Sequence, residues 1–466
     1  MHKKKNIKDL GEISEMLTPS FARGAMEMQV PKYQMPQGEM MPETAYFLIH
    51  DELMLDGNAR LNLATFISTW MEPEADRLMS ETCAKNLADK DEYTQTAELE
   101  ARCVNMVSRL WNSSDDEDAV GTSTIGSSEA AMLGGMALLK RWRKRRAFLG
   151  KAADRPNMVM GINVQVCWEK FCVYWDVEPR RVPMEGGRYH LGAEEAAGLC
   201  DENTIAVLAI MGSTFDGSYE PIREIGDALD RLQDEKGLDI PIHVDGASGG
   251  FVAPFLQPEI EWDFRVPRVQ SINASGHKYG LVYPGVGWII WRTQEALPEE
   301  LVFKVNYLGG EMPTFSLNFS RPGSQVVAQY YNFLRLGMDG YRRIHQASQD
   351  VALYLSGKLA AYEELELITD GSDIPVFAFR MTEEAKKHTN YTVFDMSERL
   401  RDRGWQMPAY TFPKNCEHIA ALRVVVREGF NRDMADLLIS DFERHMEWFK
   451  AHPEHRPKKS GHSFRH

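Results

Sequence analysis

Short apolar runs separated by helical stretches dominate residues 61–360 of the chain. Each run is too short for an ordinary helix and is mostly aliphatic or aromatic, which is typical of a buried strand. The clearest runs lie at residues 157–161, 204–211, 240–245 and 287–291. Strands that alternate with helices in this way predict βαβ units around a largely parallel sheet.

The pattern changes after a long helical stretch near residues 323–365. Two strands and two helices are predicted beyond it, at residues 374–380, 420–426, about 392–403 and about 431–450. This mixture is typical of a small α+β domain. We therefore predict an α/β protein with a large, mostly parallel-sheet domain and a small C-terminal α+β domain.

The expected domain boundaries follow from these changes of pattern. Residues 1–60 are irregular, and we expect this N-terminal segment to pack on a partner subunit. Three prolines would interrupt any long element in it, Pro31, Pro36 and Pro42. The large domain would occupy residues 61–350 and the small domain residues 351–450. Residues 451–466 are basic and polar and would form a flexible tail.

Composition and charge restrict the class of protein. With 466 residues, of which 43% are hydrophobic and 26% charged, the chain suits one large domain plus smaller ones. Its net charge of −15 argues against a nucleic-acid partner, because neutralising phosphates needs a basic surface. No apolar run reaches the roughly 18 to 20 residues of a membrane span, and no secretory signal follows the lysines near the start.

The six cysteines are scattered without Cys-x-x-Cys spacing, which favours free thiols. Cys167 and Cys172 are the closest pair, yet no histidine array flanks them, so we expect no metal site. Since nothing signals export, we expect a cytoplasmic protein.

Two residues at predicted strand ends carry the strongest chemical signal. Asp245 ends the strand at 240–245, and a short strand at 270–275 leads through Ser-Gly-His to Lys278. Ligands of α/β sheets bind beyond the carboxyl ends of the strands, where both residues would lie. Pyridoxal phosphate needs a lysine for its Schiff base and a carboxylate that keeps the pyridine nitrogen protonated. The sequence therefore predicts a pyridoxal-phosphate enzyme, although Asp-Gly also commonly caps a turn and most lysines lie on the surface.

A segment rich in glycine and hydroxyl residues at 121–130 precedes a predicted helix. The backbone N–H groups at the helix start and the hydroxyls of Ser127 and Ser128 could form a cradle for a phosphate. A serine there could instead be an ordinary N-cap. The presence of Asp245 and Lys278 favours the phosphate site.

Two histidines and a basic run allow further interpretations. His277 would contact the cofactor phosphate, whereas we expect His243 to point to the opposite face of its strand. The basic run 141–146 could be a nucleic-acid patch, but the acidic chain favours a solvated helix end whose cations stabilise the macrodipole.

These motifs resemble glutamate decarboxylases of bacteria and plants, within the group II pyridoxal-phosphate decarboxylases. The similarity runs from about residue 43 to 443 and is carried by the segments 55–66, 121–130, 243–250, 275–280 and 318–322. The Asn-Leu-Ala-Thr-Phe and Gly-Ser-Ser-Glu-Ala stretches are the most specific to glutamate as substrate. The resemblance implies the type I, aspartate-aminotransferase-like fold and α-decarboxylation of L-glutamate to 4-aminobutanoate (GABA), which consumes a proton and would resist acidification.

The resemblance also implies roles for individual residues. Lys278 would form the Schiff base, Asp245 would bind the pyridine nitrogen, and Thr214 would lie near the ring hydroxyl or the substrate carboxylate. Gln165 and Ala247 would lie against the two faces of the ring. The phosphate would be bound by Ser127, Ser128, Ser275 and His277, with Ser320 reaching over from a neighbouring subunit. The distal carboxylate of the substrate would be surrounded by Thr65, Phe66, Asn86 and Asp89, and Arg423 would bind a substrate carboxylate.

By the same resemblance the protein would be a homo-oligomer, with the dimer as the minimum and a hexamer plausible. The calmodulin-binding extension of plant relatives is not evident. Glu169 stands where a histidine is expected, so the polar surroundings of the ring would differ. Asp89 beside a glutamate carboxylate would favour activity in mild acid. The terminal His466 would regulate the site by titrating near neutrality.

Three alternatives stay open at this stage. The cofactor could serve another substrate, such as aspartate or an aromatic amino acid, or another reaction, such as aminotransfer. A catalytically silent protein could also retain the fold for interaction, for instance at a membrane surface through Lys3 to Lys5.

Overall fold

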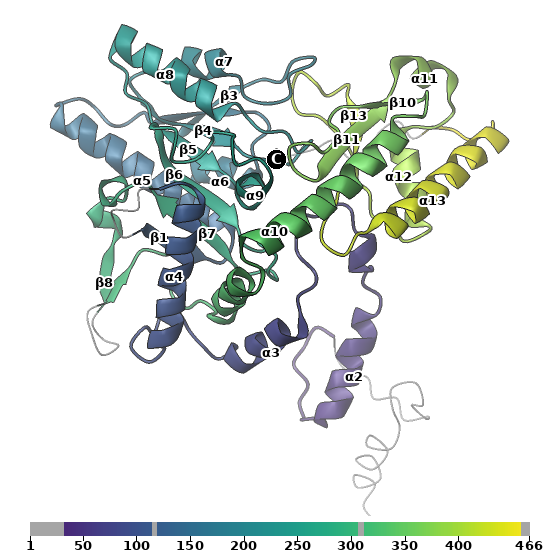
Figure 1. Cartoon of the computed structure of the whole chain (residues 1–466), viewed down its shortest axis with the longest axis horizontal. Helices are drawn as coiled ribbons and strands as arrows, with labels where there is room; N and C mark the ends of the chain where they lie inside the picture. Colours follow the sequence, from purple (N-terminus) through teal and green to yellow (C-terminus); the bar gives the residue numbers. More distant parts are fainter. Residues whose placement is uncertain (1–31, 114–118, 306–311, 458–466) are drawn as a thin grey trace, which may run out of the picture. The chain divides into compact units, whose positions relative to one another are not determined.

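The structure, a computed structural model, describes residues 32–113, 119–305 and 312–457. Within residues 62–466, seven strands form one central sheet (Figure 1). Its strands are β1 Val120–Thr124, β2 Asn157–Gly161, β3 Glu178–Val182, β4 Thr204–Ile210, β5 Ile242–Asp245, β6 Val269–Ser275 and β7 Gly287–Trp291. They lie in the order β1-β7-β6-β5-β4-β2-β3, and β7 runs antiparallel to both of its neighbours while the other pairs are parallel.

Helices cover both faces of this sheet and make it the middle of three layers. They are α4 Thr94–Leu110, α5 Ser127–Phe148, α6 Val166–Tyr174, α7 Ala193–Gly198, α8 Ile222–Lys236 and α9 Ala253–Leu256. Neighbouring residues of a strand point to opposite faces. In β4, Val207 belongs to the core that includes α4 and α8, whereas Leu208 belongs to the core that includes α5 and α6. Because both faces are covered, every residue of β4 is buried.

The predicted mostly parallel sheet is thereby confirmed. The apolar runs expected to be strands at 157–161, 204–211, 240–245 and 287–291 correspond to β2, β4, β5 and β7, and the short strand at 270–275 to β6. Strands β2, β4 and β7 could be recognised because burial on both faces demands apolar residues at successive positions.

A small antiparallel sheet with helices follows in the chain, where a small α+β domain was predicted. Its order is β10-β11-β13-β12, with bounds β10 Leu365–Leu367, β11 Val376–Met381, β12 Ala409–Thr411 and β13 Ala420–Val425. Its helices are α11 Glu383–His388, α12 Val393–Arg401 and α13 Arg432–Ala451. Of these elements, β10, β12 and α11 were not foreseen. Thr392 begins α12 with a capping box, in which its hydroxyl accepts from the Asp395 amide and the Asp395 carboxylate accepts from Thr392.

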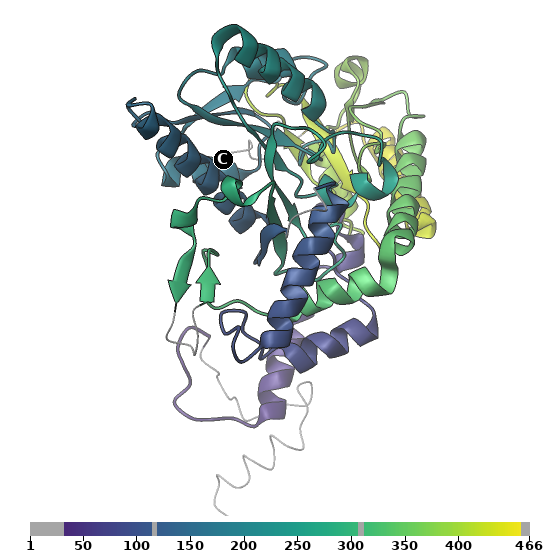
Figure 2. The same ribbon diagram turned by 60° about the vertical axis from the view of Figure 1, so that its left-hand side comes forward.

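The long helix α10, Ser324–Leu359, joins the two sheets and packs on α3 (Pro73–Thr82), α4, α9, α13 and β11 (Figure 1). Gly337 interrupts it with φ 56° and ψ −171°, a conformation open almost only to glycine. The strands β8 (Phe303–Val305) and β9 (Met312–Thr314) form a separate hairpin, which projects away from the large sheet in both views (Figures 1 and 2).

Residues 1–61 form a second unit. Its described part holds α2 (Pro42–Leu53) and a short 3₁₀ helix at Ala59–Leu61. Pro42 does not lie in the interior of a helix or strand but begins α2, so the segment expected to be irregular contains a helix. Proline occupies the first turn of α2, where its missing N–H is not needed for a helical hydrogen bond. Helix α2 buries none of its side chains, and Tyr46, Ile49 and Leu53 are exposed.

The remaining expectations concern the chain ends, membrane spans and cysteines. His466 and Lys3 to Lys5 lie outside the described residues. In the part of the chain that is described, no helix is both long and apolar enough to span a membrane. All six cysteines are described and free, and five of them are buried.

Candidate active site

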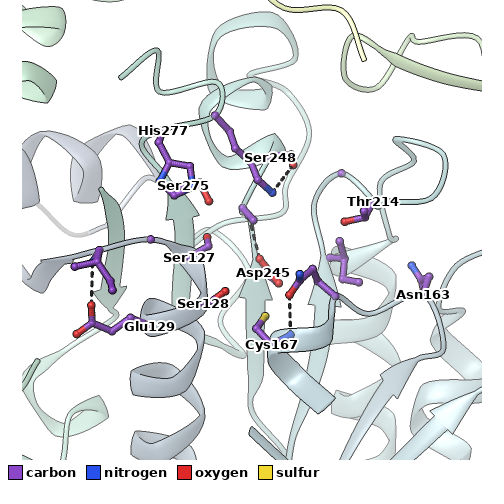
Figure 3. A pocket seen from close by; sticks show the side chains of 17 residues that line it. Ser127, Ser128, Glu129, Asn163, Cys167, Thr214, Asp245, Ser248, Ser275 and His277 are labelled. Carbon is purple, nitrogen blue, oxygen red and sulfur yellow. Dashed lines mark hydrogen bonds between the residues drawn. The ribbon is translucent and has the colours of Figure 1, made fainter. Parts of the chain in front are cut away.

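A cavity of about 370 Å³ opens at the carboxyl ends of the central strands, where α5 and α6 begin (Figure 3). Most of the predicted cofactor residues line it, namely Ser127, Ser128, Gln165, Thr214, Asp245, Ala247, Ser275, His277 and Lys278. Figure 3 shows Ser127, Ser275 and His277 on one side of Asp245, and Thr214 and Asn163 on the other. A cavity therefore lies beyond the strand ends, where the sequence predicted a ligand site.

Asp245 is the last residue of β5 and is almost fully buried. Its Oδ1 accepts hydrogen bonds from the side-chain amide of Asn273 and the backbone N–H of Ala247, both at 3.0 Å. Its Oδ2 accepts from the indole N–H of Trp168 at 2.8 Å. Three donors fix the carboxylate and compensate for part of its lost hydration.

Lys278 lies on the turn after β6 and lines the same cavity. Its Nζ donates to Ser248 Oγ at 3.3 Å and lies 5.0 Å from the centre of the Phe66 ring. Burial lowers the pKa of Lys278, and the nearby charge of Asp245 opposes this effect. A lysine amine with a lowered pKa is a better nucleophile near neutral pH, as attachment of a carbonyl cofactor requires.

The start of α5 forms one wall of the cavity. The N-cap is Gly126 and makes no side-chain cap bond, so the interpretation of a serine as an ordinary N-cap was wrong. Ser127 and Ser128 are instead the first helical residues, whose backbone N–H groups have no partner within the helix. These groups and the partial positive charge of the helix start favour an anion.

The end of β6 and the turn after it contribute Ser275 and His277 to the cavity wall. The hydroxyl of Ser275 is buried and finds no hydrogen-bond partner among the described residues. Burial, together with the neighbouring Lys278, lowers the pKa of His277 to about 4, so its ring is neutral at higher pH. An unsatisfied hydroxyl beside a helix start is a cradle that a phosphate would complete.

The remaining wall brings together residues that the sequence argument named and residues that it missed. Gln165 is the N-cap of α6, and its side-chain oxygen accepts from the Cys167 amide at 2.7 Å. Asn163, Cys167 and Ser248 also line the cavity but were not predicted. Asn163 follows the end of β2, so the strand-end rule could have indicated it.

Two predicted substrate residues lie beside Lys278. The guanidinium of Arg423, on β13, lies 5.1 Å from the centre of the Phe66 ring. It donates to the backbone oxygens of Thr214 and Ala64. Its Nε is buried without a partner among the described residues, and burial lowers the pKa of Arg423. An arginine with unused donors in a buried setting suits a carboxylate ligand. Thr65, next to Phe66, is exposed.

The other predicted substrate residues form a separate group in this chain. Asn86 Nδ2 donates to Ser320 Oγ at 3.3 Å, although the two residues are 234 positions apart. Asp89 accepts from the Glu92 amide at 3.0 Å. Within the described residues, none of Asn86, Asp89 and Ser320 belongs to the cavity wall.

Two buried carboxylates hold this Asn86–Ser320 group in place. Glu129, in the first turn of α5, accepts from the amides of Leu317 and Asn318 at 2.9 and 3.1 Å. Glu100, on α4, pairs with Arg321 at 3.5 Å. The group is therefore anchored to the same helix start that carries Ser127 and Ser128.

The expectation for His243 was wrong. His243 and Asp245 are two positions apart on β5, so their side chains point to the same face, toward α5 and α6. His243 is fully buried below Asp245 and hydrogen-bonds Ser271 and Asn273.

Glu169 has no part in the cavity wall as described. It lies on α6 and pairs with Arg181 on β3. Glu169, which stands where a histidine was expected, thus forms an ion pair at the edge of the sheet.

The basic run at the end of α5 is only partly solvated. Arg146 is buried and donates to the carbonyl of Ala152 at 2.7 Å. Arg141 donates to Gln270 at 3.1 Å, and Arg145 pairs with Asp239 at 3.1 Å. The run therefore ties α5 to β6 and to the segments before β2 and β5, which corrects the interpretation of a simple solvated helix end.

Comparison with known proteins agrees with this geometry. Residues 31–382 match the family model described as the pyridoxal-dependent decarboxylase conserved domain. The chain is 54% identical to the glutamate decarboxylase of Aliivibrio fischeri, over 97% of this chain and 96% of that protein. It is 48% identical to the glutamate decarboxylase of Solanum lycopersicum, over 96% of this chain and 88% of that protein.

A solved structure shares the fold as well as the sequence. The glutamate decarboxylase of Lactobacillus brevis superposes with a TM-score of 0.89 at 46% identity, covering 93% of this chain and 98% of that one. The type I fold expected from the resemblance is thus confirmed, and the chain belongs to the pyridoxal-dependent decarboxylase family.

Proposed function

We propose that this protein removes the α-carboxylate of L-glutamate as CO₂ and releases GABA, with pyridoxal 5′-phosphate as cofactor. The observation that carries the proposal is one cavity that holds Lys278, Asp245 and the hydroxyl cradle of Ser127, Ser128 and Ser275. Relatives that match nearly the whole chain are glutamate decarboxylases. The reaction takes up one proton per turnover, so it would contribute to acid resistance.

The residues of the cavity fit the cofactor from end to end. Lys278 would attach to it, Asp245 would keep its ring nitrogen protonated, and the cradle with His277 would hold its phosphate. Gln165, Ala247 and Thr214 would surround the ring. When bound, the cofactor accepts the electron pair of the bond to the departing carboxylate. The protein's task is to hold that bond in the productive orientation.

Binding both ends of the substrate would fix this orientation. Arg423 lies beside Lys278 and has donors to offer a carboxylate. Thr65 and Phe66 belong to the segment that contacts Arg423. Asp89 would bind the distal carboxylate by sharing a proton, which favours mildly acidic pH.

We also propose that the site is completed by a neighbouring subunit. Ser320 is expected to reach into the phosphate site of the neighbouring subunit. Because Asn86 hydrogen-bonds both Ser320 and the backbone of Asp89, Asn86 and Asp89 would lie at the same neighbouring site. The dimer would then be the minimum functional unit, with a hexamer plausible. The exposed apolar side chains of α2 support the packing of the N-terminal segment on a partner.

The proposed location is the cytoplasm, which six free cysteines support. We keep the proposed boundaries of a large domain at 61–350, a small one at 351–450 and a tail at 451–466. Regulation by His466 stays a prediction. It is tested by comparing the activity and the cofactor absorbance of the full chain with those of a chain ending before Ser463, both at neutral pH.

A substrate panel tests the proposed function. The purified protein is supplied with pyridoxal phosphate and, separately, L-glutamate, L-aspartate and L-tryptophan in mildly acidic buffer, and the amines are quantified. We expect GABA from glutamate and little amine from the others, with loss of activity in Lys278→Ala. Lys236→Ala, an exposed lysine at the end of α8, is the control and should keep full activity. Amine from another substrate alone, or 2-oxoglutarate in place of GABA, would refute the proposal.

A further inference from the structure

Three polar side chains lie buried behind the cavity and are not among the residues expected to touch cofactor or substrate. Ser271, His243 and Asn273 are at most 1% exposed, on the neighbouring strands β5 and β6. Buried polar groups of this kind are costly unless they satisfy one another. These three do so in a continuous chain of hydrogen bonds that ends at the cavity.

The chain of hydrogen bonds has one consistent direction. Asn273 Nδ2 donates to Asp245 Oδ1 at 3.0 Å and to Ser127 Oγ at 2.9 Å. The amide oxygen of Asn273 therefore points the other way, where His243 Nε2 lies at 2.7 Å. An amide oxygen only accepts, so His243 Nε2 must carry the proton.

The other ring nitrogen of His243 is then an acceptor. It lies 2.6 Å from the hydroxyl of Ser271, which donates to it. Burial lowers the pKa of His243 to about 4, which keeps the ring neutral and this arrangement intact above that pH. Flipping the Asn273 amide would turn its oxygen toward the carboxylate of Asp245, which is repulsive.

Packing holds the imidazole in this position. Gly134 of α5 lies so close that a Cβ there would be 2.5 Å from His243 Cε1. The ring of Trp168 lies 4.9 Å away and donates its own N–H to Asp245 Oδ2 at 2.8 Å. The Trp168 indole therefore contacts both His243 and the carboxylate of Asp245, while α5 packs against His243.

The two groups that Asn273 joins would bind opposite ends of one cofactor. Asp245 is assigned to the ring nitrogen and Ser127 to the phosphate, so this inference rests on the proposed function. We propose that Ser271, His243 and Asn273 form a positioning relay, which holds Asp245 and Ser127 at the separation that pyridoxal phosphate requires. His243 sets the orientation of the Asn273 amide, and Asn273 spans the two ends.

The test compares two buried asparagines. Asn273→Asp keeps the shape of the side chain but replaces its two donors by an acceptor beside Asp245. Asn157→Asp is the matched control, because Asn157 is equally buried and donates to Asp201 at 2.9 Å at the start of β2. The affinity for pyridoxal phosphate is measured by titrating each apoprotein and following tryptophan fluorescence and the visible absorbance of the bound cofactor.

We expect Asn273→Asp to weaken cofactor affinity by about tenfold or more, whereas Asn157→Asp stays within about twofold of the unmodified protein. Thermal unfolding of both apoproteins should shift by similar amounts, which separates positioning from general destabilisation. Equal cofactor affinity in the two variants would overturn the relay. No substrate is present, so failure of the unmodified protein to bind the cofactor would contradict the proposed function instead.

A second pair of variants keeps the proposal testable if Asn273→Asp does not fold. His243→Gln retains an N–H that can donate to the Asn273 oxygen, and His243→Leu does not. The relay requires His243→Gln to bind pyridoxal phosphate more tightly than His243→Leu. Equal affinities, at equal thermal stability, would contradict it.

Discussion

At the scale of single residues, the site depends on a few buried groups whose partners restrict them. Arg423 is held by the backbone oxygens of Thr214 and Ala64, yet it retains donors for a carboxylate. Only an arginine can satisfy both demands, because its guanidinium presents donors in a fixed planar fork.

Arg423→Lys tests this at constant charge. Lysine keeps the charge but lacks the planar fork of donors, so we expect kcat/KM for L-glutamate to fall about 10- to 100-fold, mainly through a higher KM. Steady-state kinetics measure it. Arg380→Lys is the control, because Arg380 lies on the adjacent strand and pairs with Glu366 at 2.7 Å. Similar kinetics for both variants would remove Arg423 from the substrate site.

Glu220 makes the stability of the protein depend on pH. Burial raises the pKa of Glu220 to about 7, although its carboxylate accepts from Asn163 at 3.0 Å, Leu191 at 2.9 Å and Ile210 at 2.7 Å. The unfolded chain releases this proton near the ordinary pKa of glutamate, whereas the folded protein keeps it to about pH 7. Its contribution to stability is therefore complete in acid and is lost as the pH rises through this window.

Glu220→Gln should remove that dependence. Between pH 5 and 7.5 the unmodified protein should lose roughly 1–3 kcal/mol more unfolding free energy than the variant does. Denaturant unfolding at the two pH values measures the difference. Parallel pH profiles of the two proteins would show that Glu220 does not titrate in this range.

At the scale of elements, the fold could be predicted where burial imposes a pattern. Strand β4 is recognisable because apolar residues fill both of its faces. His243 shows the limit of the argument, since its side was misassigned even though alternation along β5 determines it. The role of Asn273 was invisible, because it depends on contacts between strands and a helix far apart in the sequence.

Helix α10 offers a test of backbone strain alone. At Gly337 an added Cβ would meet no atom within 4 Å, but the backbone has φ 56°. Gly337→Ala should therefore lower the unfolding free energy by about 1–3 kcal/mol. Gly357→Ala, also in open space but with an ordinary helical conformation, should raise it by about 0.4–1 kcal/mol. Thermal or denaturant unfolding decides, and destabilisation of equal size in both would contradict the backbone argument.

At the scale of the whole molecule, the residues expected around the substrate fall into two groups in one chain. Phe66 and Arg423 lie beside Lys278, whereas Asn86 and Ser320 contact each other and do not line its cavity. The resemblance named all of these residues and assigned Ser320 to a neighbouring subunit, but it did not indicate that Asn86 contacts Ser320. The proposed site shared between subunits would account for both groups.

Mixed oligomers test the shared site. One chain carries Lys278→Ala and the other carries Asn86→Ala with Ser320→Ala, and each alone should have little activity. After co-expression, mixed dimers would contain one site without either defect, so activity should reappear. Mixtures that stay as inactive as the separate variants would show that each site is built from a single chain.

The most direct test of the whole account follows the carbon that leaves. L-Glutamate labelled with carbon-13 at its α-carboxylate is given to the holoenzyme in mildly acidic buffer, and labelled CO₂ and GABA are measured together. The account predicts equal amounts of both, and neither from a folded Lys278→Ala variant. Label retained in the product, or release that does not depend on Lys278, would contradict it.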